Sequence, residues 1–93
     1  MRRVTEEQLR RVARYEALMQ KAERLLATGE RSESEDKALR RHIAKLEAYY
    51  GSEDWKKDFA DDEAGLFPQD MKRGVLSEDG LYILLEKYEE DIE

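Results

Sequence analysis

Carboxylates are the most concentrated reactive groups in this sequence. Four of them fall within a six-residue run, at Asp58, Asp61, Asp62 and Glu63. Hard cations such as Ca²⁺ or Mg²⁺ need several carboxylate oxygens that converge on one point, which makes the run a candidate metal site. The run lacks the alternating ligands, central Gly and twelfth-position Glu of a calcium-binding EF-hand loop. We therefore favour an exposed helix end or a set of partners for nearby Lys and Arg side chains, and we expect no metal.

A second carboxylate pattern occurs near the C-terminus. Glu86 with Glu89 or Glu90 approaches the paired acidic residues with which all-helical nucleotide pyrophosphatases bind magnesium. These residues lie in the last helical turns, and no matching pair occurs on an apolar-flanked face of an earlier helix. Function must be argued from a complete site, so we expect no enzyme of that kind.

Nucleophilic and transition-metal chemistry also lack their usual residues. His42 is the only histidine, and the sequence contains no Cys, so a usual transition-metal site cannot form, although His42 could titrate near neutral pH. We expect it at the edge of the core. Ser52 and Ser77 stand where a helix needs a cap, which is the role we assign them. The sequence therefore predicts no catalytic residue and no cofactor.

The segment 72–77 is the most individual part of the sequence, and two interpretations of it stay open. In the first, two cations precede a flexible glycine and the amide-rich start of a helix, which together could receive an anionic ligand. The residues of this candidate binding site are Lys72, Arg73, Gly74 and Ser77. In the second, which we favour, Gly74 adopts a positive φ, Val75 and Leu76 fill the core, and a cation pairs with the acidic run.

A basic stripe follows the first predicted helix. Its members step by helical intervals, at Arg10, Arg14, Lys21 and Arg24. Such a stripe could follow phosphates, but glutamates interrupt the helix and no interleaved aromatic residues are present to stack on bases. We therefore expect no nucleic-acid partner and favour a solvated or paired face, which is the more frequent fate of such charge.

Composition limits the class of protein. The 93 residues include 17 basic and 23 acidic side chains, for a net charge of −6, and 40% are hydrophobic and recur at helical spacing. Charge is uneven, with 8 basic and 5 acidic residues in 1–31 but 5 and 14 in 51–93. The lack of Cys argues against a disulfide-stapled domain, and no apolar run approaches the length of a membrane span. We expect one cytoplasmic domain over residues 1–93.

Helix signals define the first half of the chain. Thr5 and Gln8 form a capping box that predicts a helix over 6–28, which Gly29 would end in a left-handed conformation. Ser32 and Glu35 form a second box that starts another helix. An apolar stripe along that helix suits antiparallel packing against the first, at Leu39, Ile43, Leu46 and Tyr50. Gly51 would end it, which completes a long hairpin.

The second half predicts two shorter helices and a packed loop. Ser52 caps a third helix, on which Trp55 and Phe59 share a face, and Gly65 ends it. The connection from 65 to 76 is irregular yet rich in apolar residues, so we expect it to lie across the hairpin. Ser77 and the acidic residues after it start the final helix. The fold class is all-α: a long antiparallel helical hairpin, a short third helix, a packed irregular loop and a C-terminal helix.

One stretch carries a family signature. The matching residues are Tyr49-Tyr50-Gly51-Ser52, Trp55, Pro68, Asp70, 72–79, Leu81 and Tyr82. This pattern resembles a family of small bacterial proteins designated domain of unknown function 4298, with Phe67 and Met71 where leucine is usual. The resemblance implies a charged helical hairpin followed by this segment. It implies a fold and no activity.

The favoured function is protein association without catalysis. Helices at both ends of the chain offer extra apolar positions, such as Met19 and Ile83, that a small core cannot cover, which indicates a protein partner or a homodimer. The aromatic residues that we expect in the core or at an interface are Tyr49, Tyr50, Trp55 and Tyr82. We expect Trp55 to be buried. The alternative is an anion-binding or small-ligand module centred on Lys72–Ser77.

Overall fold

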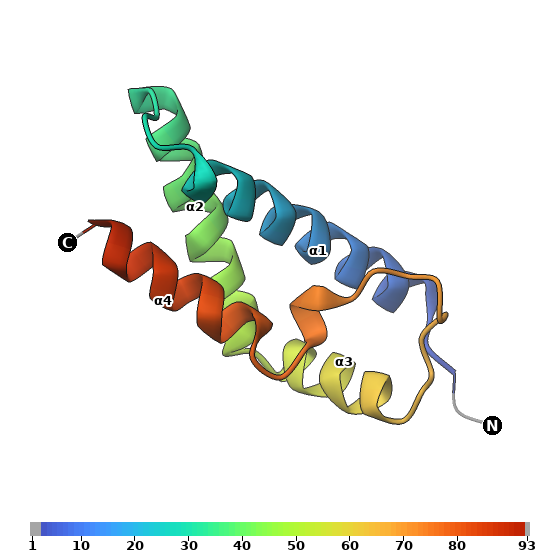
Figure 1. Ribbon diagram of the computed structural model, residues 1–93. Helices are drawn as coiled ribbons and strands as arrows, with labels where there is room; N and C mark the ends of the chain where they lie inside the picture. The colour runs from blue at the N-terminus through green and yellow to red at the C-terminus, as the bar shows by residue number, and fades with distance from the viewer. Residues whose placement is uncertain (1–2, 93) are drawn as a thin grey trace.

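Four α-helices and one short 3-10 helix make up the computed structural model, which describes residues 3–92. In chain order they are α1 (Glu6–Ala27), α2 (Glu33–Tyr50), α3 (Glu53–Glu63), η1 (Gly74–Leu76) and α4 (Gly80–Ile92). No strand occurs in this range, which confirms the all-α fold. The longest two helices form an antiparallel hairpin, and α4 lies along it (Figure 1).

Only one of the two hydrogen bonds of the predicted capping box forms at the start of α1. Thr5 Oγ1 accepts the backbone N–H of Gln8 at 3.0 Å, as a cap should. The Gln8 side chain does not complete the box, because its Nε2 donates instead to two aspartates of α3. The prediction for Gly29 is wrong: α1 ends at Ala27, and Gly65 is the one described glycine with a positive φ, at 73°.

Serine caps begin α2 and α3 as the sequence predicted. Ser32 Oγ accepts the N–H of Glu35 at 3.1 Å, and the Glu35 carboxylate accepts the N–H of Ser32 at 2.9 Å. At α3, Ser52 Oγ accepts the N–H of Trp55 at 3.2 Å. The left-handed Gly65 follows the end of that helix. These signals act within a few residues, which is why the sequence alone reveals them.

The connection from α3 to α4 packs against α1. Val75 and Leu76 of η1 are 0% and 2% exposed, so this segment fills the core as expected. Gly74 has no positive φ, contrary to prediction. α4 begins at Gly80, later than expected, because Ser77 Oγ accepts the Gly80 N–H at 2.9 Å and holds a separate turn.

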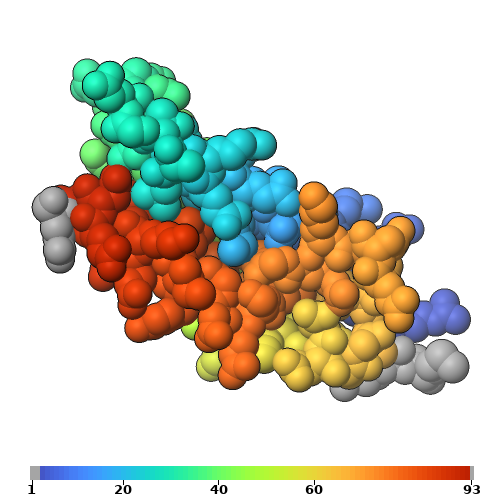
Figure 2. Space-filling model, in the orientation of Figure 1, coloured from blue at the N-terminus to red at the C-terminus, as the bar shows by residue number. Residues whose placement is uncertain are grey.

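The hydrophobic core runs along the hairpin, and the molecule is elongated. Its buried hydrophobic residues come from α1, α2, η1, α4 and the loop before η1, at Val12, Met19, Ala22, Leu39, Ile43, Leu46, Tyr49, Phe67, Val75, Leu76, Leu81 and Leu84. The Cα extents are 49 × 19 × 19 Å. Figure 2 shows α4, the η1 segment and α3 side by side on one face. In the described part of the chain, no helix has both the length and the apolar character needed to cross a membrane.

Candidate functional site

A fully buried carboxylate, Asp58, lies where α1, α2 and α3 meet. Its side chain is 0% exposed. It accepts hydrogen bonds from Gln8 Nε2 at 2.9 Å, from Arg11 Nε and Nη2 at 3.0 and 2.5 Å, and from the Tyr49 hydroxyl at 2.5 Å. A buried charge is tolerated only when it is paired and hydrogen-bonded, and Asp58 meets both conditions. Its oxygens are therefore already engaged within the chain.

The partners of Asp58 are held in fixed protonation states. Burial, followed by the hydrogen bond to Asp58, raises the pKa of the Tyr49 hydroxyl well above its ordinary value. The hydrogen bond to Asp58 raises the pKa of the Arg11 guanidinium. At neutral pH, Tyr49 is therefore a neutral donor and Arg11 a cation. None of these groups is poised near neutral pH as a general acid or base requires.

The rest of the acidic run also faces donors. Asp61 Oδ2 accepts from Gln8 Nε2 at 2.9 Å and from Lys57 Nζ at 3.2 Å. Asp62 pairs with Arg73 from the loop before η1. Over residues 3–92, no three His, Asp or Glu side chains are grouped so that they could share a metal ion. The three aspartates are thus partners for basic and amide groups, the interpretation that the sequence favoured.

The segment 72–77 binds an anionic group, and that group is a carboxylate of the same protein. Glu16 Oε1 of α1 accepts the backbone N–H of Val75 at 2.8 Å. Arg73 is engaged with Asp62 and donates from Nε to the Met71 carbonyl at 3.3 Å. The Ser77 hydroxyl donates to the Gly74 carbonyl at 2.8 Å, whereas Lys72 is exposed. The four predicted ligand residues lie together, but internal contacts use Arg73, Gly74 and Ser77.

The four aromatic residues that we expected in the core or at an interface differ in their solvent exposure. Tyr49 lies in the core and stacks on Tyr15 with ring centroids 3.9 Å apart. Tyr50 and Trp55 meet edge to face at 4.9 Å and both pack against the core, but Trp55 is only partly buried, less than expected. The Trp55 indole still donates to the Val75 carbonyl at 3.1 Å. Tyr82 is 56% exposed and belongs to the surface.

His42 lies at the edge of the core, as expected, and leaves one nitrogen unsatisfied. Its Nδ1 is buried without a hydrogen-bond partner. Burial, then the positive charges of Lys21, Arg41 and Lys45, lowers the pKa of the imidazole below its ordinary value. The neutral form is therefore favoured in the folded protein.

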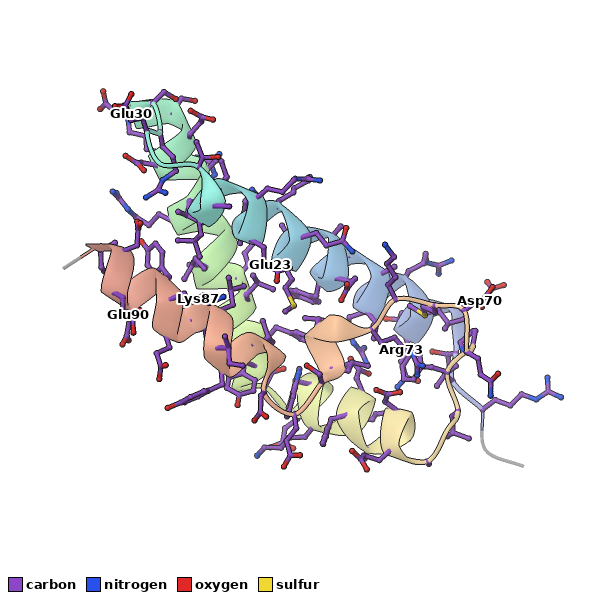
Figure 3. All side chains as sticks on the ribbon, viewed as in Figure 1. Glu23, Glu30, Asp70, Arg73, Lys87 and Glu90 are labelled. Carbon is purple, nitrogen blue, oxygen red and sulfur yellow. The ribbon has the colours of Figure 1, made fainter. Side chains whose placement is uncertain are left out.

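The exposed large hydrophobic residues of the described chain all lie on α4, but not on one side of it: Tyr82 and Ile83 are neighbours on the outward side, whereas Ile92, nine residues after Ile83, lies about 180° away around the helix, beside α2. The exposed large hydrophobic residues are Tyr82, Ile83 and Ile92, at 56%, 47% and 63%. Beside Ile83, α1 and α4 border a groove of about 490 Å³. Its apolar lining includes Leu26, Ala27 and Ile83, and its rim carries the charged Glu23, Lys87 and Glu90 labelled in Figure 3. The expected exposure of Ile83 is confirmed, whereas that of Met19 is wrong, because η1 and α4 help to cover Met19.

Sequence reasoning missed several residues that position these surfaces. Gln8 and Glu16 hold α3 and η1 against α1. Arg31 donates to the Leu25 and Thr28 carbonyls and pairs with Asp91, which ties the end of α4 to the hairpin turn. One signal was present: Gln8 precedes Val12 by four residues and therefore occupies the buried stripe of α1.

Comparison with known proteins identifies the family. The model of the domain of unknown function DUF4298 matches residues 12–93. The chain therefore belongs to this family, as its signature indicated. No curated protein and no solved structure matches the sequence.

Proposed function

We propose that this protein acts without catalysis, by associating with copies of itself through the outward side of α4. One observation carries the proposal: within residues 3–92, every exposed large hydrophobic side chain lies on this one helix. Single exposed apolar residues are normal, but the neighbours Tyr82 and Ile83 share the outward side of α4, and Ile83 also lines the groove beside α1, which is typical of an association surface. Covering an exposed Ile, Leu or Phe side chain stabilises a complex by roughly 1.5 to 3 kcal/mol before the costs of association.

The state of the reactive groups supports a noncatalytic role. Asp58 is closed off from solvent and hydrogen-bonded on both oxygens. Glu16 holds the Val75 amide, and Arg73 holds Asp62. A catalytic site needs titratable groups in an open cleft with room for a substrate, whereas these groups face one another.

A cytoplasmic location belongs to the same proposal. The sequence contains no Cys, so its stability needs no oxidising compartment. The all-helical core and the internal ion pairs hold the fold together without disulfides.

Two variants with the same change of charge test the proposal. Ile83→Glu places a carboxylate in the apolar surface of α4, and Ala60→Glu places one on the exposed side of α3. We expect Ile83→Glu to weaken self-association at least about tenfold, since a buried unpaired charge opposes association. Ala60→Glu should associate like the wild type. Sedimentation velocity over a concentration series measures both, with circular dichroism to check that helix content is kept. Equal association of Ile83→Glu and wild type would contradict the proposal.

A further inference from the structure

A second surface, on the hairpin, is strongly basic. We call it the basic face and define it by Arg14 and Lys21 of α1 and by Arg41 and Lys45 of α2. All four side chains are exposed. Over the described residues, none of them forms an ion pair with a carboxylate, and Arg14 lies over the Tyr15 ring instead, at 5.4 Å. Four unpaired cations on one face stand out in a chain whose net charge is −6.

The hairpin sorts its charges between two sides. Glu16 faces η1, Glu23 borders the groove between α1 and α4, and Glu47 lines a hollow between α2 and α4. Lys21 and Glu23 are about 200° apart around α1 at about 100° per residue. The same separation divides Lys45 from Glu47 on α2. Glu16, Glu23 and Glu47 therefore lie on the side that α4 and η1 cover, and the four cations of the basic face lie on the other.

The cations of the two helices lie near one another, because α1 and α2 pack against each other along the hairpin. Lys21 from α1 and Arg41 and Lys45 from α2 all act electrostatically on the imidazole of His42. Such an effect requires proximity, because charges separated by much more than about 10 Å are screened in physiological salt. This effect on His42 agrees with the packing of α1 against α2, which brings the exposed cations of the two helices to neighbouring positions.

α4 has the complementary charge. Its last two turns carry four carboxylates and one lysine, at Glu86, Lys87, Glu89, Glu90 and Asp91. Two α4 helices placed against each other would bring these carboxylates together, which like-charge repulsion opposes. The basic face has the opposite sign, and its small exposed residues Ala17 and Ala48 let a helix approach closely.

We propose that the α4 surface of one copy docks on the basic face of a second copy. This inference rests on the proposed function and names the surface that α4 meets. The acidic rim of α4 would face Lys21, Arg41 and Lys45, while Ile83 would be covered by the alanines of the hairpin. Nucleic acid fits less well, since the acidic remainder of the molecule repels an extended polyanion.

The positions of the α4 surface and the basic face determine how copies of the protein assemble. α4 lies along one side of the hairpin (Figure 1). The helix phases of Lys21 and Lys45, about 200° from Glu23 and Glu47, place the basic face on the other side. A contact between different surfaces is heterologous, and such contacts extend head to tail unless the rotation closes a ring. Each added copy therefore leaves one α4 surface and one basic face free.

Mixing two variants tests this arrangement. Lys21→Glu/Lys45→Glu removes the basic face and keeps α4, and Ile83→Glu does the reverse. We expect each variant alone to be monomeric and their mixture to form a 1:1 pair that grows no further, measured by sedimentation velocity at low salt. Lys56→Glu/Lys72→Glu carries the same change of charge elsewhere and should associate like the wild type.

The outcomes separate this inference from the proposed function. Self-association of Lys21→Glu/Lys45→Glu, together with monomeric Ile83→Glu, would overturn the docking on the basic face and leave association through α4 intact. Association of Ile83→Glu alone at the wild-type level would overturn both. The single histidine gives a second readout: an acidic helix over the basic face should raise the pKa of His42 in NMR titrations of the associated wild type, and an unchanged pKa would overturn the docking.

Discussion

At the residue scale, Asp58 joins three helices through one buried carboxylate. The neutral replacement Asp58→Asn leaves Arg11 with the exposed Asp54 as its remaining counter-charge, and it gives the Tyr49 hydroxyl a weaker acceptor. We expect the free energy of unfolding to fall by about 3 kcal/mol, which is typical when one partner of a buried pair is removed. Urea titration measures this loss.

A nearby exposed aspartate provides the control for Asp58. Asp54 lies 3.8 Å from Arg11, but its side chain is 63% exposed. Asp54→Asn should cost less than about 1 kcal/mol, as exposed pairs usually do. A loss at Asp58 no larger than the loss at Asp54 would show that the buried network does not stabilise the fold.

His42 predicts how stability depends on pH. Its pKa in the folded protein lies below the ordinary value of 6.5, so the unfolded chain takes up a proton more readily. Stability is therefore complete above about pH 6.5 and falls as the pH drops below that value. In high salt, where copies are kept apart, the wild type should lose stability between about pH 7 and 5.5 more steeply than His42→Gln. Equal slopes would contradict the buried, unpaired nitrogen.

The Asp58 network could not be predicted from the sequence. Its contacts join residues 47 and 50 positions apart, from Arg11 and Gln8 to the same aspartate. Charge patterning shows that Asp58 needs a partner but does not say which of the 17 basic residues supplies it. Similarly, the sequence indicated that the segment 72–77 could bind an anion. It did not show that this anion is the Glu16 carboxylate, because that contact depends on how η1 packs on α1.

At the element scale, two glycines differ in their surroundings. A Cβ at Gly80 would lie 2.4 Å from Ser77 Oγ and 2.5 Å from the Gly74 carbonyl oxygen, whereas a Cβ at Gly29 would meet nothing within 4 Å. Neither glycine has a positive φ. We expect Gly80→Ala to destabilise the protein by roughly 1 to 3 kcal/mol through overpacking, and Gly29→Ala to be neutral or slightly stabilising. Thermal unfolding of both variants decides this, and equal effects would contradict the close packing at the start of α4.

The sequence revealed the helix boundaries that depend on local signals and missed the one that depends on tertiary packing. The caps at Thr5, Ser32 and Ser52 act within three residues, and all three are present. The start of α4 was misplaced because Ser77 resembles a cap but closes a turn against η1. That turn is determined by tertiary packing, which a local signal does not contain.

At the scale of the whole molecule, folding rearranges the charge that the sequence separates. The basic N-terminal third and the acidic C-terminal half meet through Arg11 with Asp58 and Arg31 with Asp91. Of the charges that form no ion pair, Arg14, Lys21, Arg41 and Lys45 gather on the basic face of the hairpin, and Glu86, Glu89 and Glu90 gather at the end of α4. The fold class was predictable from periodicity, but this division was not, because it depends on which side of the hairpin α4 covers.

Sedimentation velocity of the wild type at two salt concentrations tests self-association most directly. The monomer mass is 11.0 kDa. At low salt and high micromolar protein, we predict a concentration-dependent species of at least about twice that mass, and its association constant should fall at least about tenfold in high salt, where the Debye length shrinks to about 3 Å. A single species of monomer mass at low salt, at every protein concentration, would contradict the proposed association.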